Sequence, residues 1–198
     1  MTSLGNEHLR NVVLLSHSGA GKTVLSEAML YTAGIISRQG TIEDGNTVSD
    51  YEPEEQDRQS SIQTTVMSCP WKDHKINIVD TPGYADFRGE VISGVQVADG
   101  VILVVSAASG IEVGTQQMWQ MAQDHNLPSM IVVTKLDREN TDFQRTLGSI
   151  VESFGRKCVA TQIPIGAEDS FSGSINLLNS GSETPESLTG QVENARDS

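Results

Sequence analysis

The chain has 198 residues and carries 26 acidic against 13 basic side chains, a formal charge of −13. A chain of this length buries one good core, and its acidic balance argues against charge-driven nucleic-acid binding, which requires a basic face. No apolar run approaches the ~18 residues of a membrane span and no secretory leader pattern opens the chain, so a cytoplasmic protein without membrane contact is expected.

The first predicted elements surround a phosphate-binding pattern. Residues 10–15 read as a strand and residues 24–33 as a helix, with Ser16-His-Ser-Gly-Ala-Gly-Lys-Thr23 between them. Small residues let backbone N–H groups at a helix N-terminus approach a polyphosphate, and the helix dipole favours the anion. Lys22 would reach the outer phosphates and the Thr23 hydroxyl would bind Mg²⁺. The predicted nucleotide-binding residues here are Ser16, His17, Ser18, Gly19, Ala20, Gly21, Lys22, Thr23 and Val24.

One position departs from the G-x-x-x-x-G-K-[ST] pattern, since Ser16 stands where the first Gly belongs. A Cβ there is strained if the position needs a positive φ. The alternative interpretation is a glycine-rich turn between strand and helix that binds no ligand. The strand and helix patterns on both sides favour the phosphate loop.

Residues 35–60 lack a steady hydrophobic period and are rich in Gly, acidic and hydroxyl residues. Such a stretch is either disordered or a functional loop. Its place after the phosphate-loop helix favours the second interpretation, because nucleotide switches keep there the segment that orders around γ-phosphate and Mg²⁺. A hydroxyl near its end is expected as a second metal ligand, and spacing leaves four candidates: Ser60, Ser61, Thr64 and Thr65.

A β-hairpin with a five-residue loop is predicted from residues 62–69 and 75–80, and its second strand ends on Asp80. A carboxylate at the C-terminal end of a central strand can hold Mg²⁺ through water. Gly83, three residues on, leaves a backbone N–H free to meet a terminal phosphate. A simple turn after the strand would explain Pro82 and Gly83 but not the acid before them.

Helices and strands alternate through the rest of the chain. The patterns predict helices over 87–98 and 113–125, and a further helix that is capped by Thr141 and ends before Gly155. They also predict strands buried among apolar neighbours over 101–105 and 130–134, and one more strand within 157–165. Residues 179–187 are flexible by composition. The four histidines are scattered without ligand spacing, so no zinc site is predicted, and both cysteines are expected to be reduced.

The strand over 130–134 leads into Thr134-Lys-Leu-Asp137. A carboxylate accepts two hydrogen bonds from the N1–H and N2–H₂ groups of guanine, while a Lys stem packs along the base. Adenine lacks those two donors. A site built on such hydrogen bonds can discriminate against a ligand that lacks them by a factor of ~10⁴ or more. A four-residue motif alone is a weak signal. Its position at the end of a predicted strand strengthens the prediction of a base-binding loop.

Taken together, these stretches resemble the nucleotide-binding domain of elongation factor G and its ribosome-acting relatives. The resemblance covers residues 9–178 and is carried by residues 16–23, 30–34, 44–50, 58–62, 80–87, 99–100 and 134–138. It implies an α/β P-loop NTPase fold of the translational GTPase type, with a mostly parallel sheet, one antiparallel edge strand and helices on both faces. It also implies that residues 1–166 form an incomplete GTP-binding domain and that 167–198 begin an inserted subdomain.

The resemblance implies GTP or GDP with Mg²⁺ as ligands and the ribosome as a partner of the full-length protein. Ser61 then becomes the switch hydroxyl that binds Mg²⁺ beside Thr23, with Asp80 acting through water. Lys22, Gly83 and Tyr84 become the catalytic residues, the last by positioning water. The remaining nucleotide contacts it implies are Asp80, Thr81, Pro82, Gly83, Tyr84, Thr134, Lys135, Leu136 and Asp137.

The chain departs from that family at several positions. Ser16 and Gly19 replace a Gly and an Asp of the phosphate loop, and Thr134 replaces an Asn of the base pocket. The chain also ends before the last guanine-contact loop. Tyr84 replaces the His that orients water, and a phenol with a reference pKa near 10 is a poor base. This combination resembles the second-type, elongation factor G-like paralogues.

The implied function is a GTP-binding, GTP-hydrolysing domain of a ribosome-associated factor for protein biosynthesis, a hydrolase whose turnover is slow without a partner. Two alternatives stay open. One is a GTP-binding switch with little or no hydrolysis, suggested by Tyr84. The other is an unrelated ATP-using P-loop enzyme, which Asp137 disfavours.

Overall fold

A computed structural model describes residues 5–178 and 188–196. The stretch expected to be flexible, 179–187, lies outside the described residues. The chain divides into two compact units, one running to Val105 and including Glu112–Val132, the other made of Ser106–Ile111 and the chain from Val133 onward. Each unit is described by itself.

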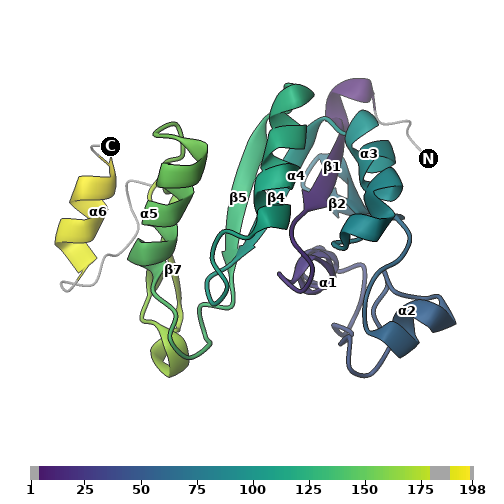
Figure 1. The fold of residues 1–198 in the computed structure, drawn as a ribbon, viewed down its shortest axis with the longest axis horizontal. Coiled ribbons are helices and arrows are strands. Elements are labelled where there is room, and N and C mark those ends of the chain that lie inside the picture. Colours follow the sequence, from purple (N-terminus) through teal and green to yellow (C-terminus); the bar gives the residue numbers. More distant parts are fainter. Residues whose placement is uncertain (1–4, 179–187, 197–198) are drawn as a thin grey trace. The chain divides into compact units, whose positions relative to one another are not determined.

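A five-stranded sheet with the order β2-β3-β1-β4-β5 organises the first unit (Figure 1). β1 pairs in parallel with β3 and β4, and β2 pairs antiparallel with β3 at one edge. This confirms a mostly parallel sheet with one antiparallel edge strand. The strands are β1 Leu9–Leu15, β2 Thr65–Trp71, β3 His74–Asp80, β4 Gly100–Ser106 and β5 Ser129–Thr134.

Helices cover both faces of this sheet. Leu14 of β1 packs with Leu30 of α1 (Lys22–Thr32) in one buried cluster. Gly94 of α3 (Arg88–Gln96) lies against Val13, the preceding residue of β1. Successive strand residues point to opposite faces, so α1 and α3 lie on opposite sides. The helix α4 (Val113–Asp124) follows the predicted range and buries Met118 and Met121.

The strand β5 was predicted to be fully buried, and this is wrong. None of its six residues is fully buried, and Met130 is 60% exposed. The reason is its place at the end of the strand order, where a strand has a neighbour on one side only. The central strand β4 meets the expectation, with Leu103, Val104 and Val105 nearly inaccessible.

The hairpin loop is also shorter than predicted. β2 and β3 pair as far as Trp71 opposite His74, which leaves Lys72 and Asp73 as the turn instead of five residues. Lys72 takes a positive φ of 52°. Pro70 is tolerated inside β2 because an edge strand does not need every N–H for pairing.

A short helix, α2 (Pro53–Arg58), lies in the stretch expected to be without regular structure. Six residues are too few to show a hydrophobic period. The sequence did carry its start signals, since Pro53 occupies the first turn and Glu52 and Glu55 form a capping box.

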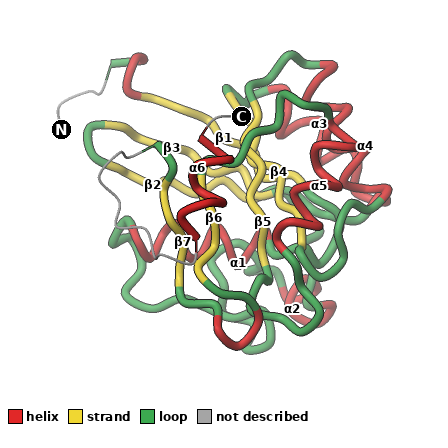
Figure 2. The backbone as a smooth tube through the Cα atoms, turned by 90° about the vertical axis from the view of Figure 1, so that its left-hand side faces the viewer, coloured by secondary structure: helices red, strands yellow, loops and turns green. Residues whose placement is uncertain are grey.

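The second unit contains α5 (Phe143–Phe154), β6 (Gln162–Ile165), β7 (Gly173–Asn176) and α6 (Thr189–Arg196). β6 and β7 form a separate antiparallel pair (Figure 2). Their inward side chains pack with Val192 of α6. The pairing spans residue 166 within this unit, and the domain boundary expected there stays a prediction.

The cap of α5 is one residue later than predicted. Asp142 is the N-cap, and its carboxylate accepts from the Arg145 N–H at 3.0 Å. Thr141 instead donates its hydroxyl to the Leu136 and Arg138 carbonyls. Across 5–178 and 188–196, no helix combines the length and the apolar character needed to cross a membrane.

Candidate nucleotide site

The loop between β1 and α1 has the backbone that a phosphate loop needs. Gly19 and Gly21 have φ values of 75° and 98°, which L side chains rarely adopt. Ser16 is absent from the positive-φ positions of the described chain, so its Cβ causes no strain there. Instead its hydroxyl accepts a hydrogen bond from Lys22 Nζ at 2.8 Å. The serine that departs from the motif therefore holds the loop lysine.

A second loop meets this one directly after β3. A Cβ added to Gly83 would lie 2.7 Å from Ser18 Cα and 2.8 Å from Lys22 Nζ. Only glycine permits this approach, so the backbone of Gly83 lies close to the phosphate loop and to its lysine. Burial lowers the pKa of Lys22, while the charges of Asp80 and Asp50 act in the opposite direction.

Five oxygen-bearing side chains meet next to Lys22. Asp80 Oδ2 accepts from the Thr23 hydroxyl at 3.1 Å and from the Ser49 hydroxyl at 2.9 Å. Thr23 Oγ1 also lies 3.3 Å from Ser61 Oγ. The Ser61 hydroxyl in turn donates to Asp50 Oδ1 at 2.6 Å. The structure thus brings Thr23, Ser61 and Asp80 together and adds two residues that sequence reasoning missed.

Two of the other three hydroxyl candidates, Thr64 and Thr65, have partners elsewhere. The Thr64 hydroxyl donates to the Glu90 carbonyl at 3.3 Å, and the Thr65 hydroxyl donates to the Ser49 carbonyl at 3.0 Å. Ser61 is the candidate whose side chain contacts both Thr23 and Asp50. The geometry therefore favours Ser61 among the hydroxyls that spacing left open.

This cluster fits a magnesium ion. Within the described chain, Asp80 Oδ1 and Asp50 Oδ2 are buried and lack a hydrogen-bond partner. Burial is the largest cause that raises the pKa of both carboxyls, and a cation held beside them would act in the opposite direction. Mg²⁺ prefers oxygen ligands, and octahedral bonds of ~2.1 Å place neighbouring ligands about 3 Å apart. The 3.3 Å between Thr23 Oγ1 and Ser61 Oγ is close to that spacing.

The loop segment, residues 35–64, is held in place by buried carboxylates. Glu27 of α1 accepts from the backbone N–H groups of Gly40 at 2.7 Å and Val48 at 2.6 Å. Glu55 of α2 accepts from the N–H of Ile62 at 2.9 Å. Both glutamates are 1% exposed. These bonds order the backbone that carries Ser49, Asp50 and Ser61.

Other predicted contact residues lie at the margins of the site. The Thr81 hydroxyl donates to the Leu14 carbonyl at 2.7 Å, which ties the Asp80 loop to β1. Pro82 is buried, whereas Val24 on α1 is 51% exposed. Tyr84 is 50% exposed and precedes the short turn over 85–87. An exposed phenol there is free to meet water.

The ring of His17 packs against the start of α4. Its Nε2 lies 3.4 Å from Glu112 Oε1, and a Cβ on Gly114 would lie 2.4 Å from its Nδ1. The histidine therefore ties the phosphate loop to α4 through its ring, a role that the sequence did not indicate.

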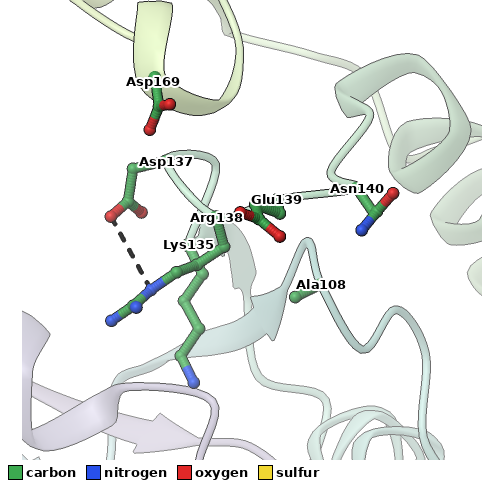
Figure 3. A pocket seen from close by; sticks show the side chains of 7 residues that line it. All are labelled: Ala108, Lys135, Asp137, Arg138, Glu139, Asn140 and Asp169. Carbon is green, nitrogen blue, oxygen red and sulfur yellow. Dashed lines mark ion pairs between the residues drawn. The ribbon is translucent and has the colours of Figure 1, made fainter.

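The proposed base loop lies in the second unit. Thr134, Lys135, Leu136 and Asp137 follow β5, and a cavity of about 650 Å³ opens beside them (Figure 3). This volume is ordinary for a small-molecule site. Asp137 lies 4.0 Å from Arg138 Nε, and its side chain is 65% exposed. The lining residues are Ala108, Lys135, Asp137, Arg138, Glu139, Asn140 and Asp169.

The two parts of the predicted site are thus each assembled, one in each unit. Lys22 and Asp80 meet in the first unit, and Lys135 and Asp137 flank the cavity of the second. That all four touch one nucleotide stays a prediction.

Comparison with known proteins identifies the family. The model of the elongation factor Tu GTP-binding domain matches residues 7–190. Elongation factor G of Granulibacter bethesdensis is 37% identical over 178 residues, 90% of this chain and 26% of that protein. Elongation factor G 2 of Streptomyces coelicolor is 38% identical over 169 residues, 85% of this chain and 25% of that protein.

Ribosome-releasing factor 2, mitochondrial, of Candida albicans is 38% identical over 164 residues, 83% of this chain and 20% of that protein. The chain therefore spans about a quarter or less of these relatives. A crystal structure from Thermus thermophilus matches with a TM-score of 0.88 and 33% identity, covering 95% of this chain and 30% of that one. The chain belongs to the elongation factor Tu GTP-binding domain family, and its relatives include elongation factor G and the elongation factor G 2 paralogues.

Proposed function

We propose that this chain binds and hydrolyses GTP as the nucleotide domain of a ribosome-associated, elongation factor G-like protein. The observation that carries the proposal is the meeting of Lys22, Thr23, Ser61 and Asp80 at the C-terminal ends of β1 and β3. Open α/β sheets bind their ligands at this end. The family match supports guanine as the base.

In this proposal the backbone N–H groups of residues 18–23 and the Lys22 ammonium bind the β- and γ-phosphates. A water molecule attacks the γ-phosphorus in line with the bond to the β-phosphate oxygen. That bond breaks, and GDP and inorganic phosphate leave. Lys22 and the N–H of Gly83, a residue whose backbone approaches Lys22 closely, stabilise the charge on the transferring group.

Mg²⁺ would be held by the hydroxyl oxygens of Thr23 and Ser61, and by Asp80 through water. The ion supplies positive charge that offsets the charge of the phosphates. Asp50 fixes the Ser61 hydroxyl from the opposite side through their 2.6 Å hydrogen bond. Asp50 thereby positions Ser61 toward Thr23.

We assign the placement of the attacking water to Tyr84. A phenol holds water by one hydrogen bond but takes its proton poorly, because its reference pKa is near 10. Turnover of the isolated protein is therefore slow and rises with a partner. The same residue supports the second candidate, a GTP-binding switch with little hydrolysis, which single-turnover rates with and without ribosomes distinguish.

The name of ribosome-releasing factor 2 supports the ribosome as that partner. The cytoplasm is part of the proposal as the compartment. The relatives are about four to five times longer than the match, so this partner belongs to the full-length protein. We assign residues 1–166 to the GTP-binding domain and 167–198 to the start of an inserted subdomain.

The test uses competition at the base pocket of the full-length protein. Labelled GTP is displaced by unlabelled ATP or xanthosine triphosphate, on wild type and on Asp137→Asn. ATP should not displace labelled GTP from wild type. The variant should gain affinity for xanthosine triphosphate by on the order of 10²-fold, because its amide donates a hydrogen bond that the xanthine carbonyl accepts. Equal displacement of GTP by ATP in wild type would support the ATP-using alternative and refute the proposal.

A further inference from the structure

A second group of potential metal ligands lies at the other end of β1. Leu9 of β1 pairs with Lys75 of β3, so the residues just before them, His8 and His74, are neighbours. Their rings meet edge to face with centroids 5.3 Å apart. Asp73 of the hairpin turn completes the group, and one ligand atom from each residue lies within 4.8 Å of the others.

The carboxylate of Asp73 stands between the two rings. Its Oδ1 is 2.8 Å from His74 Nδ1, and its Oδ2 is 3.7 Å from His8 Nδ1. The second distance is too long for a hydrogen bond. His8 Nδ1 is buried and has no hydrogen-bond partner among the described residues. A buried polar nitrogen without a partner is costly, which points to a ligand that satisfies it.

We propose that His8, Asp73 and His74 form a binding site for a divalent transition-metal ion, with Zn²⁺ as the reference. Two imidazole nitrogens and one carboxylate oxygen form a typical zinc ligand set, with solvent in the fourth position. Tetrahedral bonds of ~2.0–2.1 Å place ligand atoms about 3.3 Å apart. Asp73 Oδ1 is 2.8 Å from one ring nitrogen and Oδ2 is 3.7 Å from the other, on either side of this value. The three ligand atoms lie within 4.8 Å of one another, so small side-chain rotations would close them on an ion. Mg²⁺ prefers oxygen and does not compete well for imidazole.

The proposed site differs from the expectation drawn from sequence spacing. The histidines are far apart along the chain, and the parallel register of β1 and β3 brings two of them together. A bound ion would join the short turn Asn6–His8 to the tip of the β2–β3 hairpin. β1 has seven residues, so at ~3.3 Å per residue about 20 Å separate this site from the phosphate loop. The inference is independent of the proposed function.

The experiment titrates ZnCl₂ into the full chain in excess Mg²⁺, followed by calorimetry and by thermal unfolding. Wild type should bind one Zn²⁺ and unfold at a higher temperature when zinc is present, because an ion that binds only the folded chain stabilises it. His8→Gln and His74→Gln should each weaken binding by about tenfold or more. His125→Gln is the matched control, since the ring of His125 instead contacts the Met121 carbonyl at 2.9 Å, and zinc affinity should be unchanged.

Thermal unfolding without zinc, measured beside each titration, reports whether a variant folds. Absence of zinc binding in wild type, or equal affinity in wild type and in His8→Gln, overturns the proposal. Loss of zinc affinity in His125→Gln equal to that in His74→Gln overturns it as well. Should His74→Gln unfold, His8→Gln decides, since His8 lies in the turn before β1.

Discussion

The phosphate site and the base loop are built in opposite ways. Lys22, which begins α1, is 7% exposed and Asp80, which ends β3, is 0% exposed, whereas 65% of the Asp137 side chain is accessible to solvent. The base cavity is lined mostly by one stretch, residues 135–140. The first site therefore depends on tertiary packing and is coupled to stability. The second reads its ligand with exposed groups, so its residues can change without disturbing the fold.

Two lysines give the largest expected contrast. Lys22→Ala removes the ammonium from the phosphates, so kcat/KM for GTP should fall by on the order of 10³-fold. Lys135→Ala removes a stem that packs on the base, so GTP affinity should fall by about tenfold while the single-turnover rate of bound GTP is unchanged. Rapid-quench and equilibrium binding measurements separate the two effects. Equal losses of rate in both variants would remove the distinction between the sites.

Asp80→Asn should lower turnover and raise stability at the same time. The loss of a carboxylate that acts on Mg²⁺ through water should slow hydrolysis by on the order of 10²-fold. Burial raises the folded pKa of Asp80 above 3.8, so the folded state holds its proton more tightly than the unfolded state. Stability from this group is present at low pH and is lost as pH rises through the folded pKa.

The nucleotide-free Asp80→Asn variant should therefore gain unfolding free energy over wild type as pH rises from 4 to 7, measured by urea unfolding. Asp44→Asn is the control, because Asp44 is exposed on the loop segment, and it should change neither stability nor turnover. A pH-independent difference between Asp80→Asn and wild type would contradict the assigned burial effect.

Glu27→Gln tests how the loop segment is held. The carboxylate accepts from two backbone N–H groups, and an amide presents its own N–H₂ to one of them. A buried donor then loses its partner, which costs about 2 kcal/mol. Limited proteolysis near residues 40–48 should become faster, by about 30-fold at that energy. Glu43→Gln, at an exposed position of the same segment, should be cleaved like wild type.

The sequence predicts best what is contiguous. The phosphate loop and Asp80 could be found because strand, turn and helix signals adjoin them, and the mostly parallel sheet was implied by the family resemblance that these stretches carry. Ser49 and Asp50 could not be found, since their place depends on how the segment folds around α2. The role of Glu27 was hidden for a related reason, because a glutamate in a helix usually indicates a solvated face.

Ser16→Ala should have the smallest effect on the phosphate site. The hydroxyl accepts from Lys22 Nζ at 2.8 Å and donates to the His17 carbonyl at 2.6 Å. Its loss leaves a buried ammonium with one acceptor fewer and should cost about 1.5 kcal/mol of unfolding free energy. Ser18→Ala, a change of the same size in the same loop, should cost less than about 0.5 kcal/mol. Urea unfolding of the nucleotide-free chain measures the unfolding free energy of both variants. Equal costs would mean that the Ser16 hydroxyl does not hold Lys22. A larger cost for Ser16→Ala that disappears in the Lys22→Ala background would place the effect in this one hydrogen bond.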